Sequence, residues 1–148
     1  MEKKNKKLIF TLLIIVFITV LAVAGLLSDR SDESNPTAEE YFNISGILYT
    51  GEKENSHLWV YPFVSFNISA IEGDATEIVI TNIPGMSDDV YVGTINKTDS
   101  KRVSLQLRNK VLLAPTENGF PFRFRISCHE LYDWITIYLQ WPPPEISS

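Results

Sequence analysis

The chain has 148 residues, a formal net charge of −5 at pH 7 and 45% hydrophobic residues. Four of its 13 Lys and Arg residues lie in the first seven positions, so the remainder is markedly acidic. Such a domain is not expected to bind nucleic acid, because affinity for phosphate backbones needs clustered positive charge. The single cysteine, Cys128, excludes an intrachain disulfide, and apolar packing must therefore hold the fold together.

Residues 8–27 form an unbroken apolar run behind the basic flank 1–7. At ~1.5 Å per residue, a helix of this length spans about 30 Å, the thickness of the hydrocarbon core of a bilayer. We therefore predict a single-pass membrane protein with a signal-anchor helix, a cytoplasmic N-terminus and an extracytoplasmic C-terminal domain. Small residues before Gly25 also suit cleavage after Ala24, although the run is longer than the apolar region of a cleavable signal peptide. Both interpretations export the domain.

Residues 28–40 are polar and lack apolar periodicity, which predicts a linker between the membrane helix and the domain. Residues 142–148 begin with three prolines, which cannot donate hydrogen bonds to a sheet, and this predicts a Pro-rich tail outside the fold. The domain itself is thus expected to span residues 41–141.

Apolar and polar side chains alternate through most of residues 41–141, and turn-forming residues occupy the intervals. This pattern is typical of β-strands with one buried face. About seven short strands in a domain of this size predict an all-β fold, an antiparallel two-sheet sandwich of the immunoglobulin-like type. The predicted strands are 41–50, 57–71, 76–83, 89–96, 102–109, 120–128 and 133–141, and 111–113 is a candidate extension of the fifth beyond a bend.

The alternation also assigns the two faces of each strand. In the second predicted strand, Phe66 and Ile68 share one side and are expected to face the core. In the sixth, Phe122 and Phe124 are expected inside, and Cys128 falls on the same register. We interpret Cys128 as a small apolar filler of the core, since free cysteine is among the most buried residue types.

Aromatic and basic residues on the outward positions are the candidate contacts with a partner or a glycan. They are Trp59, Tyr61, Arg123, Arg125, Trp134 and Tyr138. If the sixth and last predicted strands pair as a hairpin, the two arginines would lie beside the aromatic residues of the last strand and form cation–π contacts. The alternatives are stacking that only covers the sheet, or a bulge near Pro62 that returns the aromatic residues of the second strand to the core.

Three sequons mark candidate glycosylation sites at Asn43, Asn67 and Asn96, although so short a motif also arises by chance. No catalytic, metal-binding or nucleotide-binding motif occurs, so we expect no metal or other cofactor. We also expect no enzymatic activity, unless through an unrecognised site.

An apolar helix followed by a β domain resembles the architecture of small envelope proteins such as archaellum stator subunits and minor pilins. The residues Lys6-Lys7-Leu8 lack the glycine of a pilin processing site, and we assign no family. We predict a structural or protein-interaction role at the cell envelope, with an envelope protein as the partner. The alternative is a glycan-binding module that uses exposed aromatic side chains.

Overall fold

The computed structural model describes residues 36–129 and 131–145. The flank 1–7, the predicted membrane helix 8–27 and most of the linker 28–40 lie outside these residues. Within the described ranges, no helix is long and apolar enough to cross a bilayer. The chain divides into two compact units, Met1–Asn35 and Pro36–Ser148, and the second is the β domain.

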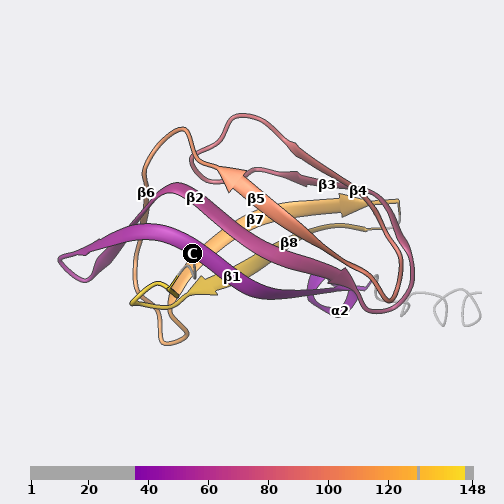
Figure 1. The fold of residues 1–148 in the computed structure, drawn as a ribbon, viewed down its shortest axis with the longest axis horizontal. Coiled ribbons are helices and arrows are strands. Elements are labelled where there is room, and N and C mark those ends of the chain that lie inside the picture. The colour runs from indigo at the N-terminus through magenta and orange to yellow at the C-terminus, as the bar shows by residue number, and fades with distance from the viewer. Residues whose placement is uncertain (1–35, 130, 146–148) are drawn as a thin grey trace, which may run out of the picture. The chain divides into compact units, whose positions relative to one another are not determined.

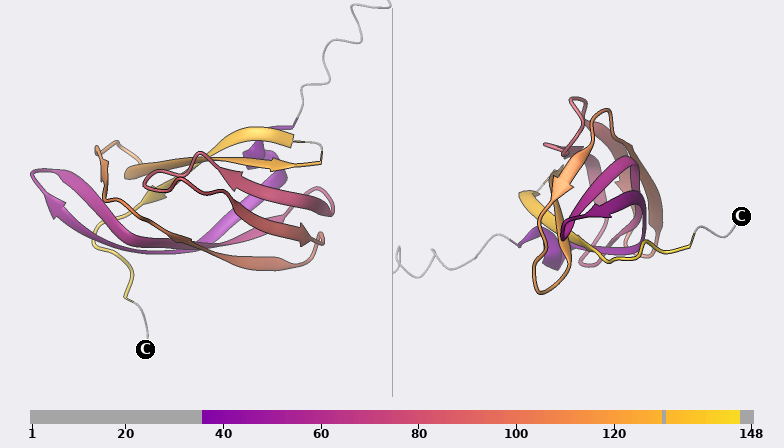
Figure 2. Two further views of the ribbon diagram at one scale, coloured as in Figure 1. Left: turned by 90° about the horizontal axis from the view of Figure 1, so that it is seen from above. Right: turned by 90° about the vertical axis from the view of Figure 1, so that its left-hand side faces the viewer.

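The domain is a β-sandwich of two antiparallel sheets, which confirms the predicted all-β class; Figure 2 shows the two layers. A short helix, α2 (Ala38–Tyr41), precedes the first strand. Sheet A consists of β1 (Phe42–Glu54), β2 (His57–Ala70), β5 (Ser100–Gln106) and β6 (Val111–Leu113). Sheet B has the order β4 (Val90–Ile95), β3 (Ala75–Thr81), β7 (Phe120–Cys128) and β8 (Leu131–Leu139).

Residues 111–113 form a separate strand, which follows β5 after the predicted bend and pairs with the same edge of β2. Strand β5 pairs with the half of β2 that begins at Phe63, whereas β6 pairs with Leu58–Val60. Between them the chain bends, because the amides of Arg108 and Asn109 both donate to the carbonyl of Gly85. The described residues thus contain eight strands, and two of them share one edge of β2.

Strands β1 and β2 form a long hairpin whose tip lies at the opposite end of the domain from α2 (Figure 1). Asn55 and Ser56 connect the strands, with φ angles of 48° and 69°. Two successive residues with positive φ are the signature of a type I′ turn, which suits the twist of a hairpin. The 13 residues of β1 extend roughly 40 Å at ~3.3 Å per residue, so the hairpin separates the two ends of the domain.

The core follows the predicted alternation. Phe66 and Ile68 of β2 are fully buried, as are Phe122 and Phe124 of β7. The rings of Phe66 and Phe124 stack across the two sheets, with centroids 5.3 Å apart and an interplanar angle of 10°. Cys128 is half-buried against this core, on the register predicted for it.

Helix α2 lies within the range predicted as linker, yet it packs on the domain. The Thr37 hydroxyl accepts a hydrogen bond from the Glu40 amide, and the Glu40 carboxylate accepts one from the Thr37 amide, which makes a capping box. Ala38 is completely buried and Tyr41 nearly so. The end of the 28–40 segment is therefore part of the fold.

The hairpin tip gives a prediction about stability. Replacing Ser56 with glycine removes a Cβ from a left-handed backbone position, which costs most L-residues ~1–2 kcal/mol. Because glycine is more flexible in the unfolded chain, we expect Ser56→Gly to stabilise the protein by about 0.5–1 kcal/mol in urea unfolding. Asn55→Gly is the matched control and should change stability less, since asparagine tolerates this conformation. Equal gains at both positions would contradict this account of the turn.

The stacked ring pair gives a second prediction. Phe66→Ala leaves a cavity between the sheets, and we expect it to lower the free energy of unfolding by about 3–5 kcal/mol. Phe63→Ala on the outward register of the same strand should cost about 1 kcal/mol or less. Chemical denaturation of both variants, monitored by circular dichroism, would test whether inward and outward positions of β2 differ as described.

Candidate functional site

Two arginines and two aromatic residues form a cluster on the outer face of sheet B. Antiparallel pairing of β7 and β8 sets Arg125 opposite Trp134. The guanidinium carbons of Arg123 and Arg125 lie 4.7 Å and 4.9 Å from the centroid of the Trp134 ring. Arg125 also lies 4.1 Å from the centre of the Tyr132 ring and donates a hydrogen bond of 2.8 Å to its hydroxyl. We call these four residues the arginine–aromatic cluster.

The predicted cation–π contact is thus observed for Trp134, but not for the tyrosine that was expected. Tyr138 lies opposite Pro121, toward the other end of the hairpin, and Tyr132 takes its place beside Arg125. The difference arises because β8 begins at Leu131, two residues before the predicted start, which brings Tyr132 into the sheet.

A fifth residue, Tyr91, extends the outer face of sheet B beyond the cluster. Tyr91 pairs with Val79 of β3, Val79 pairs with Ser127 of β7, and Ser127 pairs with Tyr132 of β8. The four residues therefore form one row across the sheet. Tyr91 and Tyr132 at the two ends of the row are 71% and 62% exposed. In the sequence, Tyr91 lies between two valines of a short strand. This pattern is too weak to identify Tyr91 as a surface contact residue.

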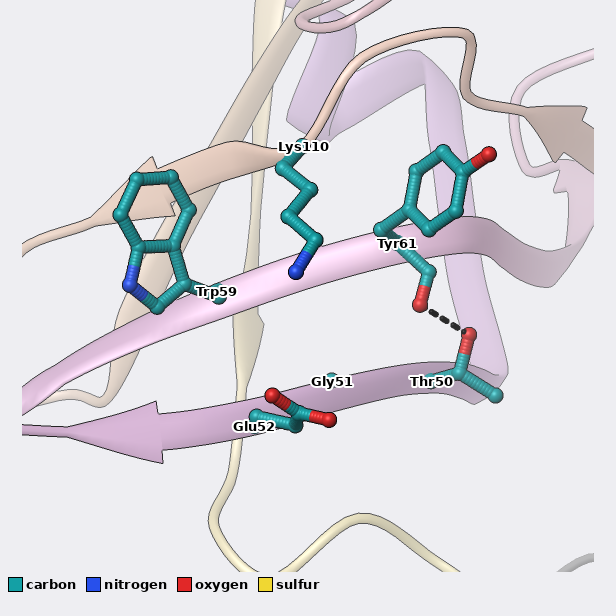
Figure 3. A pocket seen from close by; sticks show the side chains of 6 residues that line it. All are labelled: Thr50, Gly51, Glu52, Trp59, Tyr61 and Lys110. Carbon is teal, nitrogen blue, oxygen red and sulfur yellow. Dashed lines mark hydrogen bonds between the residues drawn. The ribbon is translucent and has the colours of Figure 1, made fainter.

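A second candidate site lies on the outer face of sheet A. Trp59 and Tyr61 both point outward from β2, so the predicted alternative of a bulge that returns them to the core is wrong. They line a shallow groove of about 220 Å³, together with Lys110 before β6 and residues 50–52 of β1 (Figure 3). The Lys110 side chain lies between the two rings in Figure 3. We call this site the aromatic groove.

The structure does not bring the two sets of candidate residues together. The aromatic groove belongs to sheet A and the arginine–aromatic cluster to sheet B, and each faces away from the core that the sheets share. The six predicted contact residues therefore divide between two opposite surfaces.

The chain matches no protein-family model, no curated protein and no solved structure.

Asp133 connects the cluster to helix α2. Its carboxylate accepts hydrogen bonds from the amides of Ala38, at 3.0 Å, and of Trp134, at 2.7 Å. These two bonds, with a smaller contribution from Arg123 and Arg125, hold the pKa of Asp133 below its usual value. The carboxylate thus fixes the first residue of α2 to β8, close to the stacked arginines. Sequence reasoning missed this role, although Asp133 lies on the same face of β8 as the buried isoleucines of that strand.

A second link closes the other end of β8. Tyr49 of β1 is 1% exposed, and its hydroxyl donates a hydrogen bond of 2.5 Å to the carbonyl of Gln140. Burial raises the pKa of this hydroxyl, which therefore remains a donor at neutral pH. The bond joins the edge of sheet A to the end of sheet B.

The three sequons differ in their surroundings. Asn43 on β1 and Asn96 after β4 are exposed, and the Asn96 amide donates to Asp99. Asn67 is half-buried on β2, and its carbonyl accepts a hydrogen bond from Arg102. Glycosylation of Asn67 would disturb this contact, so we expect modification, where it occurs, at the other two positions.

The anchor of α2 gives a prediction about pH. Asp133→Asn removes a charged acceptor of two amides, and we expect it to lower the free energy of unfolding by about 1 kcal/mol at pH 7, because the carboxylate is partly exposed. Since the folded-state pKa lies below the unfolded value of ~3.9, the stabilisation is complete above that pH and is lost as the pH falls through the folded value.

The measurement is urea unfolding of both proteins at several pH values between 3 and 7. The difference in stability should be constant from about pH 5 upward and should shrink below about pH 4. Asp89→Asn, at an exposed carboxylate before β4, is the control and should have little effect at any pH. A difference for Asp133→Asn that does not change with pH would contradict the charged anchor.

Proposed function

We propose that this chain is a single-pass membrane protein whose extracytoplasmic β-sandwich binds a partner protein of the cell envelope through the outer face of sheet B. The apolar run 8–27 with its four preceding lysines supports the anchor and its orientation. The sandwich order, with β1, β2 and β5 in one sheet and β3, β4, β7 and β8 in the other, supports an immunoglobulin-like assignment of the domain.

The observation that carries the proposal is the stacking of Arg123 and Arg125 on Trp134 and Tyr132. Tryptophan, tyrosine and arginine are the residues most enriched at energetic hot spots of protein interfaces. Here they gather on one sheet face with a further exposed tyrosine, Tyr91. Rigid aromatic rings and arginines held in place by stacking lose little conformational freedom when a partner binds.

The chemistry of the partner surface follows from the arginines. Among the described residues the one salt bridge joins Arg108 and Asp88, so neither Arg123 nor Arg125 is paired with a carboxylate. Stacking occupies the flat face of a guanidinium and leaves N–H groups at its edge, which on the exposed Arg123 suit bidentate contact with a carboxylate. The Nε of Arg125 is buried, and one of its terminal nitrogens donates to Tyr132. We therefore propose a partner that presents Asp or Glu side chains beside apolar groups.

The edges of the sheets are less suited to a partner strand than this face is. Strand β1 carries two irregularities in its pairing with β2, and α2 packs against the first part of β8. Bulges and covering elements of this kind protect edge strands from pairing with other chains. Side-chain contacts on the outer face of sheet B are therefore the better-supported mode of binding.

The cluster also lies close to helix α2 in the fold. Asp133, between Tyr132 and Trp134, binds the amide of Ala38 at the point where the chain enters the domain. Only a short segment separates Ala38 from the predicted membrane helix 8–27. These facts support a partner that is itself a membrane or envelope protein.

The test is site-specific crosslinking of the full-length protein in its native membranes. A photoreactive amino acid in place of Tyr91 should form a recurrent crosslink to one envelope protein, and the same group in place of Leu112 on sheet A should not. In this setting we expect Arg123→Gln with Arg125→Gln to reduce the crosslink about tenfold or more, because two hot-spot contacts are lost.

Two further variants make this prediction specific. Arg123→Lys with Arg125→Lys retains the positive charges but lacks the planar guanidinium groups, and it should restore only part of the crosslink. Lys97→Gln, in the turn before β5, is the control for loss of positive charge and should leave the yield of the crosslink unchanged. Absence of any crosslink from Tyr91, or crosslinks that occur only between copies of this chain, would refute a separate envelope partner.

A further inference from the structure

The aromatic groove on sheet A has the composition of a ligand site and not of a covered sheet surface. Trp59 and Tyr61 supply two ring faces, and Tyr61 is 43% exposed. Thr50, Glu52 and Lys110 place a hydroxyl, a carboxylate and an ammonium group around the same space (Figure 3). Apolar faces and a few polar groups that converge on one cavity are typical of small-ligand sites.

Two local features shape this groove in advance of any ligand. The indole nitrogen of Trp59 donates a hydrogen bond of 3.1 Å to the carboxylate of Glu54, which orients the ring. Gly51 forms part of the lining, and a Cβ there would come within 2.6 Å of the carbonyl oxygen of Trp59. At this register shift between Tyr49 and Gly51, the neighbouring backbone therefore excludes a side chain from the lining.

The charges of the groove select against ionic ligands. Lys110 and Glu52 contribute one positive and one negative group, and the salt bridge among the described residues does not involve either of them. An anion would be repelled by Glu52, whereas a cation would be repelled by Lys110. A neutral ligand with many hydroxyl groups can instead accept hydrogen bonds from Lys110 and donate them to Glu52.

The aromatic rings indicate which neutral ligand fits. Their electron-rich faces attract the polarised C–H groups on the flat side of a sugar ring. An extended peptide, by contrast, gains affinity from unpaired backbone groups at a sheet edge. Here Leu58–Val60 of β2 pair with both β1 and β6, and the carbonyl of Tyr61 accepts a hydrogen bond from the Thr50 hydroxyl.

We propose that the aromatic groove binds a neutral oligosaccharide, with sugar rings stacked on Trp59 and Tyr61. The groove lies on the part of the β1–β2 hairpin near its tip, away from α2 (Figure 1). This site is independent of the protein contact proposed for sheet B, because it occupies the opposite face.

The test is binding of defined hexasaccharides to the full-length protein in nanodiscs, which avoids sugar-based detergents. The probes are β-1,4-linked glucose, β-1,4-linked N-acetylglucosamine and α-1,6-linked mannose, with a hexamer of galacturonate as the acidic comparison. We expect saturable binding of at least one neutral probe and about tenfold or greater loss of affinity in Trp59→Ala. Trp141→Ala, at an exposed tryptophan outside both proposed sites, should leave the affinity unchanged.

The charge argument has its own test. Glu52→Gln retains a hydrogen-bond acceptor and leaves Lys110 as the only charge, so affinity for the galacturonate hexamer should rise about threefold or more. Thermal unfolding of each variant confirms that the domain is folded. No binding of any neutral probe, equal losses in Trp59→Ala and Trp141→Ala, or preferential binding of the galacturonate by the unaltered protein would overturn the proposal. Failure of these experiments would leave the crosslinking result for sheet B unaffected.

Discussion

The constraint on which the structure depends is that two sheets must be held together by apolar packing, without a disulfide. Cys128, the single cysteine, is only half-buried at the margin of the core. The stacked rings of Phe66 and Phe124 and the buried isoleucines beside them occupy the inward positions. Because successive side chains on a strand point to opposite faces, the residues between them must point outward. Binding chemistry in this domain is therefore confined to the two outer faces and the loops.

The domain also has two different ends. At one end, Asp133 and the buried Ala38 fix α2 to β8, so that the chain enters the fold in a defined position. At the other, the type I′ turn of Asn55 and Ser56 closes a hairpin that no other element extends past in Figure 1. The arginine–aromatic cluster adjoins the first end, and the aromatic groove is near the second. The two candidate sites therefore lie toward opposite ends of the domain as well as on opposite faces.

Local patterning was enough to predict much of this from the sequence. The predicted strand 120–128 coincides with β7, because phenylalanines and arginines alternate there without interruption. The contact of Arg123 and Arg125 with Trp134 followed once the hairpin was assumed. Helix α2 could not be predicted in this way, since it is only four residues long and depends on Asp133, 95 residues farther along the chain. The same holds for Lys110, which reaches the groove only because β6 pairs with β2.

The two outer faces differ in chemistry in a way that suits different ligands. On sheet B the cations are held by aromatic rings and, within the part of the chain that the structure describes, form no salt bridge with a carboxylate. On sheet A the single cation and the single anion of the groove offset each other, and hydrogen bonding and stacking remain. Contacts on one face have no residue in common with contacts on the other, and such distant sites contribute to binding additively. On the two proposals, one domain would bind a partner protein and a neutral oligosaccharide on opposite faces, and neither would require a change in the core between them.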